Sequence, residues 1–196
     1  MKTGCRSVAG KKVGVLALQG AFTEHEIALA RCGARPCQIR TELEIEAVDA
    51  LIIPGGESTT IGKLMLSFGL LEPIRRRVKE GMPIWGTCAG MILLAKEIVD
   101  MEQVRLELMD IAVKRNAYGR QVDSFEAELE VEGLQPSRGV FIRAPYVERV
   151  WGHAHVLCRV KDKTVMVRED NRLATAFHPE LTNDLTIHQY FLRMLN

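Results

Sequence analysis

The feature that most limits the fold of this chain is a repeated pattern of a short apolar run, a glycine-containing turn and a segment with helical spacing. The apolar runs occupy residues 13–18, 48–53 and 82–85. A strand that is apolar on both sides is typical of a parallel sheet whose two faces are covered by helices. The intervening helices supply the crossovers that parallel strands need. The pattern therefore predicts an α/β fold.

The rest of the chain extends this pattern and then changes it. Helices are predicted over residues 23–32, 60–68, 71–79, 91–99 and 184–195, and a further short strand over 36–40. From about residue 106, closely spaced strand-like segments are typical of antiparallel strands. They lie at residues 126–131, 139–143, 153–160, 164–168 and 173–177. The sequence thus predicts a three-layer α/β fold. Its central sheet is mostly parallel and flanked by helices, with antiparallel additions in the C-terminal half.

The length of the chain fits one domain. It has 196 residues, and domains commonly hold about 100–200 residues. Residues 1–11 are basic and rich in small residues, so we expect them to form a flexible tail, and residues 12–196 to form a single domain. The apolar run at 13–18 is too short for a membrane span or a signal peptide. We therefore expect a cytoplasmic protein that has no membrane partner.

Composition argues against several classes of function. Lys and Arg total 26 and Asp and Glu total 25, which gives a net charge of +1 and argues against a nucleic-acid-binding protein. The five cysteines cannot all pair within one chain, and none lie in a C-x-x-C spacing. A disulfide framework and a structural zinc site are therefore disfavoured. We expect neither a metal nor a cofactor.

Cys88 lies in the segment Gly86-Thr87-Cys88-Ala89-Gly90, between a predicted strand and a predicted helix. A turn of this kind presents a nucleophile, and its flanking glycines remove side chains that would clash. The N-terminus of a helix favours the thiolate form of a cysteine, and the backbone N–H of Ala89 is free to bind an oxyanion. The alternative interpretation is a buried structural cysteine.

His178 and Glu180 supply the partners that such a nucleophile needs. Pro179 disfavours a helix at His178, so we expect an extended stretch with His178 and Glu180 on the same side. Glu180 could then accept a hydrogen bond from one ring nitrogen, while the other nitrogen takes a proton from Cys88. The other four histidines lack this pairing. His25 has a glutamate on each side, but adjacent residues on a helix do not face each other.

A third motif, PGGESTT at residues 54–60, follows a predicted strand and opens a predicted helix. Its two consecutive glycines permit backbone angles that aim N–H groups at an anion. The motif lacks the spacing of a phosphate-binding Walker loop. A plain turn with a Ser or Thr helix cap is an equally good interpretation of this segment.

Together these motifs resemble those of class I, triad-type glutamine amidotransferases, and within that class those of the glutaminase subunits of pyridoxal 5′-phosphate synthases. The matching segments are LQGA at 18–21, PGGESTT at 54–60, GTCAG at 86–90, RNAYGRQ at 115–121, FIRAP at 141–145 and FHPELT at 177–182. The triad segments are shared by many amidotransferases, whereas GGESTT, RNAYGRQ and FIRAP are narrower. Residues 146–155 depart from the family pattern, and we expect them to form a surface loop.

The resemblance implies roles for particular residues. Cys88 would be the nucleophile, His178 the general base and acid, and Glu180 the carboxylate that orients His178. Backbone N–H groups of Gly56 and Ala89 would form the oxyanion hole. Contacts to glutamine would come from Gly56, Glu57, Ser58, Arg115, Ile142 and Arg143. An arginine suits the α-carboxylate of glutamine and an acidic side chain its α-ammonium group, but the sequence does not decide which arginine is used.

The implied reaction is hydrolysis of L-glutamine to L-glutamate and ammonia through a glutamyl thioester. The resemblance also implies a protein partner, the synthase (lyase) subunit that uses the ammonia to make pyridoxal 5′-phosphate. Three alternatives stay open at this point. They are a glutaminase of another amidotransferase, such as that of histidine biosynthesis, a catalytically inactive binding module, and a cysteine hydrolase acting on other amides. Arg115 and Arg143 favour an amino-acid substrate over the last.

Overall fold

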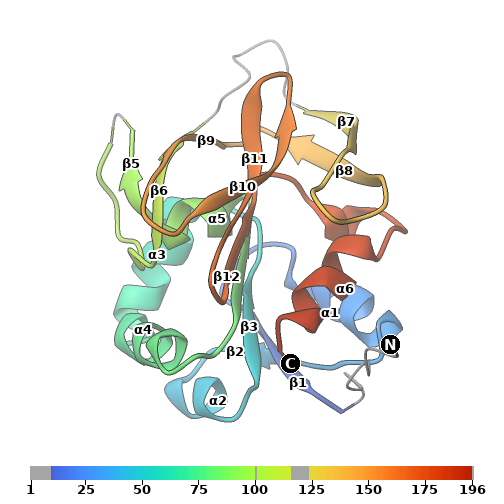
Figure 1. Cartoon of the computed structure of the whole chain (residues 1–196). Helices are drawn as coiled ribbons and strands as arrows, with labels where there is room; N and C mark the ends of the chain where they lie inside the picture. Colours follow the sequence, from blue (N-terminus) through green and yellow to red (C-terminus); the bar gives the residue numbers. More distant parts are fainter. Residues whose placement is uncertain (1–9, 100, 116–123, 196) are drawn as a thin grey trace.

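The computed structural model describes residues 10–99, 101–115 and 124–195. Strands and helices alternate in the first half of the chain, and strands predominate in the second (Figure 1). In chain order the elements are β1 (Lys12–Leu16), α1 (Phe22–Arg31), β2 (Arg35–Ile39), α2 (Glu42–Glu46), β3 (Ala50–Ile53), α3 (Ser58–Ser67), α4 (Leu71–Lys79), β4 (Ile84–Thr87), α5 (Ala89–Leu94), β5 (Ala95–Ile98), β6 (Met109–Lys114), β7 (Ser124–Leu129), β8 (Ser137–Ile142), β9 (Tyr146–Val150), β10 (His155–Val160), β11 (Lys163–Glu169), β12 (Arg172–Thr175), the 3₁₀ turn η1 (Pro179–Leu181) and α6 (Thr186–Arg193).

Ten of the described strands form one sheet in the order β2-β1-β3-β4-β12-β11-β9-β6-β5, with β10 paired to β11. Strands β2, β1, β3, β4 and β12 are parallel to one another, and so are β5 and β6. Strand β11 is antiparallel to β12, β9 and β10, and β9 is antiparallel to β6. The prediction of a mostly parallel sheet with antiparallel additions in the C-terminal half is therefore confirmed.

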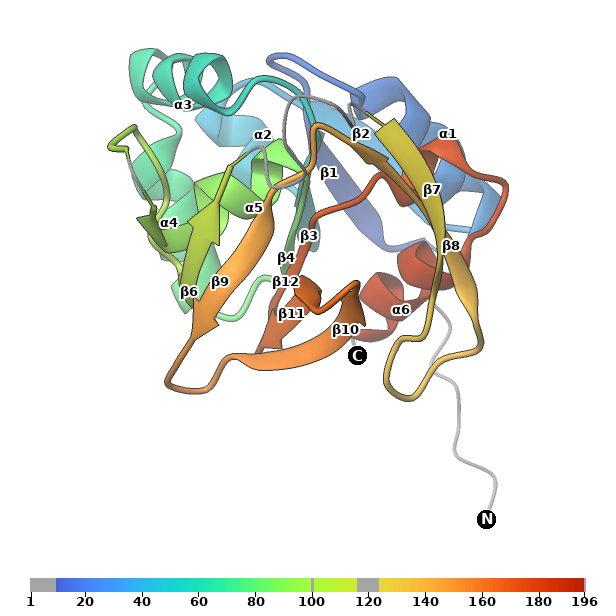
Figure 2. The ribbon, with the colours of Figure 1, turned by 90° about the horizontal axis from the view of Figure 1, so that it is seen from above.

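Helices cover both faces of this curled sheet. Helices α1 and α6 lie on one side, and α3, α4 and α5 lie on the other (Figures 1 and 2). Every residue of β3 and β4 is consequently buried, which explains why β3 is apolar throughout and why β4 contains no charged residue. Helix α1 buries a stripe that contains His25, Ala28 and Leu29. Within the described ranges, no helix is both long enough and apolar enough to cross a membrane.

The parallel strands bring several turns to one edge of the sheet. Strands β1, β3, β4 and β12 all end at this edge, and the segments that follow them begin at residues 17, 54, 88 and 176. In an open α/β sheet, ligands bind outside the carboxyl ends of the strands. Strands β7 and β8 form a separate two-stranded sheet. An antiparallel bridge between Val140 of β8 and His178 joins that sheet to the same edge.

The structure differs from the predicted elements in four segments. Helix α2 and strand β6 lie where no helix or strand was predicted, and two predicted segments have a different structure. The predicted helix over residues 91–99 ends at Leu94, and Ala95–Ile98 is strand β5, because its backbone pairs with β6. The predicted surface loop over residues 146–155 contains strand β9, which pairs with β6 and β11. In both segments, pairing with strands distant in the sequence outweighs the local pattern. Most of the predicted tail, residues 1–9, lies outside the described residues.

Candidate active site

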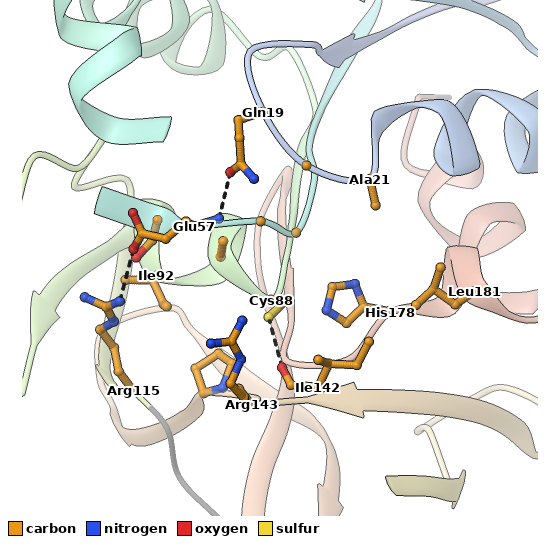
Figure 3. A pocket seen from close by; sticks show the side chains of 16 residues that line it. Gln19, Ala21, Glu57, Cys88, Ile92, Arg115, Ile142, Arg143, His178 and Leu181 are labelled. Carbon is orange, nitrogen blue, oxygen red and sulfur yellow. Dashed lines mark hydrogen bonds and ion pairs between the residues drawn. The ribbon is translucent and has the colours of Figure 1, made fainter. Parts of the chain in front are cut away.

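A pocket of about 430 Å³ lies at the carboxyl edge of the parallel strands (Figure 3). Every site residue predicted from the sequence lines it except Glu180, which lies behind the ring of His178. The lining residues are Gln19, Gly20, Ala21, Gly55, Gly56, Glu57, Ser58, Cys88, Ala89, Ile92, Arg115, Ile142, Arg143, Pro145, His178 and Leu181. Segments that are more than 150 residues apart in the sequence therefore meet around one cavity.

Cys88 occupies the sharp turn between β4 and α5 that its sequence context predicts. Its backbone has φ 48° and ψ −100°, a left-handed conformation that is uncommon for a residue with a side chain. The flanking glycines are sterically required. A Cβ on Gly86 would lie 2.4 Å from the carbonyl of Gly90, and one on Gly90 would lie 2.2 Å from the carbonyl oxygen of Ile53. The turn holds the Cys88 sulfur at the pocket, 3.9 Å from the carbonyl oxygen of Ile142.

His178 is held from two sides. Its backbone N–H donates to the carbonyl oxygen of Val140 at 2.8 Å, and its Nδ1 lies 2.7 Å from Oε1 of Glu180. Because the carboxylate can only accept, Nδ1 carries the proton and Nε2 is left for Cys88. The local geometry differs from the prediction, since Glu180 lies in the 3₁₀ turn η1 rather than in an extended chain. The turn still brings the carboxylate to the ring.

The surroundings of His178 favour its charged form. Burial by itself lowers the pKa of the ring, but hydrogen bonding with Cys88 and with Glu180 outweighs burial and raises the pKa to about 10. The carboxyl of Glu180 shows the complementary effect. Burial would raise its pKa, yet the nearby His25 and His178 lower it below its usual value. A protonated His178 beside an ionised Glu180 is therefore stable at neutral pH.

The segment that would supply an oxyanion hole is held against the turn after β1. The carbonyl oxygen of Gly55 accepts a hydrogen bond from the N–H of Ala21 at 3.0 Å, and the N–H of Glu57 donates to Oε1 of Gln19 at 2.7 Å. The peptide bond between Gly55 and Gly56 is trans, so the N–H of Gly56 points in the direction opposite to the carbonyl oxygen of Gly55. It therefore points away from Ala21, whose N–H binds that oxygen. The second candidate donor, Ala89, is the first residue of α5, so its N–H has no partner within the helix.

Glu57 and Arg115 hold each other at one wall of the pocket (Figure 3). The Glu57 carboxylate accepts hydrogen bonds from the N–H groups of Thr59 and Thr60 and so caps α3. One guanidinium nitrogen of Arg115 lies 3.3 Å from its Oε1. Burial would raise the pKa of Glu57, but the hydrogen bonds from Thr60 and Thr59 lower it to about 2. Glu57 is therefore ionised at neutral pH.

Ile142 is the last residue of β8 and Arg143 follows it, and both line the pocket below Cys88 in the view of Figure 3. Arg143 has a φ of 42°, so its backbone is strained. Among the described residues no carboxylate forms an ion pair with Arg143, in contrast to Arg115. Its charge is thus available to an anionic ligand. In the part of the chain that the structure describes, no group of three His, Cys, Asp or Glu side chains could hold a metal ion.

Comparison with known proteins assigns the family. Residues 15–196 match the SNO glutamine amidotransferase family. The chain belongs to this family. A protein of Carboxydothermus hydrogenoformans named pyridoxal 5′-phosphate synthase subunit PdxT is 58% identical over 183 residues, which cover 92% of this chain and 96% of the relative. The protein of that name in Desulforudis audaxviator is 60% identical over 183 residues, 92% of this chain and 97% of the relative.

A solved structure shows that the SNO amidotransferase fold is shared as well. A crystal structure of a glutamine amidotransferase superposes with a TM-score of 0.90 at 53% identity, covering 93% of this chain and 98% of that chain. The resemblance stated from the motifs is therefore confirmed, and this SNO glutamine amidotransferase is an enzyme. Residues 116–121 of its RNAYGRQ motif lie outside the described residues.

Three polar residues of the SNO amidotransferase contact the predicted site residues although the motifs gave them no role. Gln19 binds the N–H of Glu57, and Oε1 of Gln103 lies 3.3 Å from a guanidinium nitrogen of Arg115. His25 lies 3.4 Å from Glu180. A signal for His25 was present in the sequence, because it lies three and four residues before Ala28 and Leu29 on the buried stripe of α1. A histidine on such a stripe needs a buried polar partner.

Replacing Gly55 with alanine is expected to slow glutamine hydrolysis by the SNO amidotransferase by about 10²-fold, because catalytic groups tolerate little displacement. A Cβ at Gly55 would lie 2.2 Å from Cε1 and 2.9 Å from Nδ1 of His178, so the ring must move. The measurement is kcat for glutamate release, with circular dichroism to check the fold.

Gly33→Ala is the matched control for Gly55→Ala. Gly33 has a φ of +84° and no atom within 4 Å of an added Cβ. The substitution should cost about 1 kcal/mol of stability through backbone strain and leave kcat unchanged. An unchanged kcat for Gly55→Ala as well would contradict the placement of His178 against this turn.

Proposed function

We propose that Cys88, His178 and Glu180 form a catalytic triad that hydrolyses L-glutamine to L-glutamate and ammonia. The observation that carries this proposal is the strained turn that holds Cys88 at the pocket, beside a histidine whose Nδ1 is 2.7 Å from a buried carboxylate. A nucleophile, a base and a group that orients the base are the three parts that covalent acyl transfer needs. Family membership supports glutamine as the acyl donor.

The reaction follows from these positions. The Cys88 thiolate attacks the side-chain carbonyl carbon of glutamine, and the N–H groups of Gly56 and Ala89 stabilise the oxyanion. Protonated His178 gives its proton to the departing nitrogen, which leaves as ammonia, and a glutamyl thioester remains. His178, now neutral, takes a proton from a water molecule that attacks the thioester. Collapse of that intermediate releases glutamate and restores the thiolate and the protonated ring.

The two arginines of the pocket suit different parts of the substrate. Arg143 pairs with no described carboxylate, so we assign the α-carboxylate of glutamine to it. Glu57 is half-exposed and ionised, which suits the α-ammonium group, and Arg115 keeps Glu57 in place. In this proposal, Ser58 and Ile142 supply the remaining contacts to glutamine. The pairing of Glu57 with Arg115 supports this assignment of the two arginines.

The proposal includes a partner and a location. Relatives that match along nearly their whole length are named as subunits of pyridoxal 5′-phosphate synthase. We therefore propose that residues 12–196 act as a single domain that passes ammonia to a synthase subunit. A shielded route is chemically useful, because ammonia is mostly protonated in neutral water and then is not a nucleophile. The free thiols of Cys32, Cys37, Cys88 and Cys158 are compatible with the reducing cytoplasm.

Glutamate release by the full chain, measured with and without its synthase subunit, tests this proposal. We expect weak hydrolysis by the chain alone and at least about tenfold faster hydrolysis in the complex, because a partner at the pocket mouth can order the Gly55-Gly56 segment. Equal rates with and without the synthase would contradict the partner assignment. Absence of hydrolysis in a complex that forms would identify a catalytically inactive binding module.

A further inference from the structure

A buried network of polar side chains contacts Glu180 on the side away from His178. His25 of α1, His188 of α6 and Thr87 of β4 are each 0% exposed. His25 Nε2 lies 3.4 Å from Oε2 of Glu180 and 3.2 Å from Oγ1 of Thr87. His25 Nδ1 lies 3.0 Å from Nε2 of His188. Trp85 packs edge-on against both imidazole rings, with centroids 5.4 and 5.0 Å away. These contacts tie the triad carboxylate to helices on one face of the sheet.

The contacts determine which nitrogen of His25 carries the proton. Oε2 of Glu180 is buried and accepts no hydrogen bond from any described residue, and Nε2 of His25 faces it at 3.4 Å. A carboxylate oxygen can only accept, so a stable arrangement needs the proton on Nε2 of His25. Nδ1 of His25 must then accept, and the N–H at Nε2 of His188 donates to it. This leaves Nδ1 of His188 as a bare acceptor, which agrees with its lack of a partner within the described part of the chain.

The imidazole rings of His25 and His188 are both neutral at neutral pH. Burial lowers the pKa of His25 more than the attraction of Glu180 raises it, and His178 lowers it further, while Glu24 raises it slightly. Burial, followed by His25, lowers the pKa of His188 to about 3, against smaller opposing effects of Glu180 and Asp184. His25 therefore offers Glu180 a neutral N–H dipole. The triad keeps its single negative charge, which remains available to stabilise protonated His178.

We propose that His25 is a positioning residue for the hydrolysis of glutamine. Its Nε2–H faces Oε2 of Glu180 at 3.4 Å and disfavours rotation of the carboxylate, which keeps Oε1 2.7 Å from Nδ1 of His178. His188 acts one step further away by fixing the tautomer of His25. This inference rests on the proposed function, because it assigns His25 a task only if Glu180 orients His178.

Three substitutions of His25 test the positioning role in the complex with the synthase subunit. In glutamine the amide nitrogen reaches the place of ring Nε2, whereas in asparagine it reaches only the place of Nδ1. His25→Gln should retain kcat within about threefold. His25→Asn and His25→Leu should each lose about tenfold in kcat, as is usual when a group that orients a catalytic residue is removed, with KM for glutamine unchanged.

The pH profile separates positioning from a loss of folded protein. When Glu180 no longer faces Nδ1 of His178, the protonated ring loses a stabilising partner and its pKa falls from about 10. The alkaline limb of kcat should therefore move to lower pH in His25→Asn and His25→Leu, and stay in place in His25→Gln. A merely structural role would reduce the amount of active enzyme without moving this limb.

The outcomes distinguish this inference from the proposed function. The inference is overturned if the Asn and Leu variants keep the kcat and alkaline limb of the unmodified enzyme, or if the Gln variant is as impaired as they are. If His25→Leu does not fold, the comparison of Gln with Asn decides, since both keep a polar side chain. A Cys88→Ala control that still hydrolyses glutamine would instead refute the proposed function itself.

Discussion

Cys88→Ala is expected to abolish glutamine hydrolysis, with a loss of more than about 10⁴-fold in kcat, as is typical when the nucleophile of a triad is removed. The substitution removes the sulfur atom that forms the thioester in the proposed mechanism and changes little else. The side chain is 8% exposed, and alanine keeps the Cβ that the strained turn already accommodates. The measurement is glutamate release in the complex with the synthase subunit, with thermal melting to confirm the fold.

Cys158→Ala is the matched control for this experiment. Cys158 is 2% exposed in β10 and does not line the pocket, so its loss affects packing only. Burial raises the pKa of the Cys158 thiol to about 11, which makes it a poor nucleophile. The Cys158 variant should hydrolyse glutamine at the unmodified rate and still be labelled at Cys88 by a glutamine-analogue electrophile. Label on any other cysteine would refute Cys88 as the nucleophile.

Glu180→Gln is expected to lower kcat by about 10²- to 10³-fold. The loss should be smaller than the roughly 10⁴-fold seen when the acid of a serine triad becomes an amide, since a cysteine ionises far more readily than a serine. A carboxylate accepts from His178 on one oxygen and faces His25 with the other. A carboxamide cannot accept from both rings. Its NH₂ group must oppose one ring N–H, so His178 or His25 changes tautomer or turns away.

The same substitution has a predicted effect on pH dependence. Glu180 helps to raise the pKa of His178 to about 10, so removal of its charge lowers that pKa. His178 then loses its proton at a lower pH, and the alkaline limb of kcat should move in that direction. Glu169→Gln is the control, because Glu169 is a buried carboxylate that pairs with Arg172 and does not line the pocket. It should cost stability and leave the limb unmoved. An unmoved limb in Glu180→Gln would contradict the triad assignment.

Local rules account for the parts of the fold that the sequence predicted. The apolar runs of β1, β3 and β4 and the glycine turns after β3 and β4 act over a few residues, and these strands lie where the pattern placed them. Gly86 is an example, because a Cβ there would clash with Gly90 a few residues further along the same turn. The segments β5 and β9 were predicted incorrectly, since β5 becomes a strand by pairing with β6, and β9 by pairing with β6 and β11. Pairing partners distant in the sequence are not visible in a local pattern.

The sequence by itself determined the family, the α/β class and the identity of the candidate triad, because these depend on residue types at short spacings. Only the tertiary structure decided which side chains contact the candidate triad and which arginine of the pocket is paired. Arg115 is paired with Glu57, whereas Arg143 has no described carboxylate partner, and His25 faces the second oxygen of Glu180. His25 and Glu180 are 155 positions apart in the numbering and meet because α1 packs against η1 at the edge of the sheet. Burial then requires each polar atom to find a partner, and the packing of distant helices selects which partner it finds.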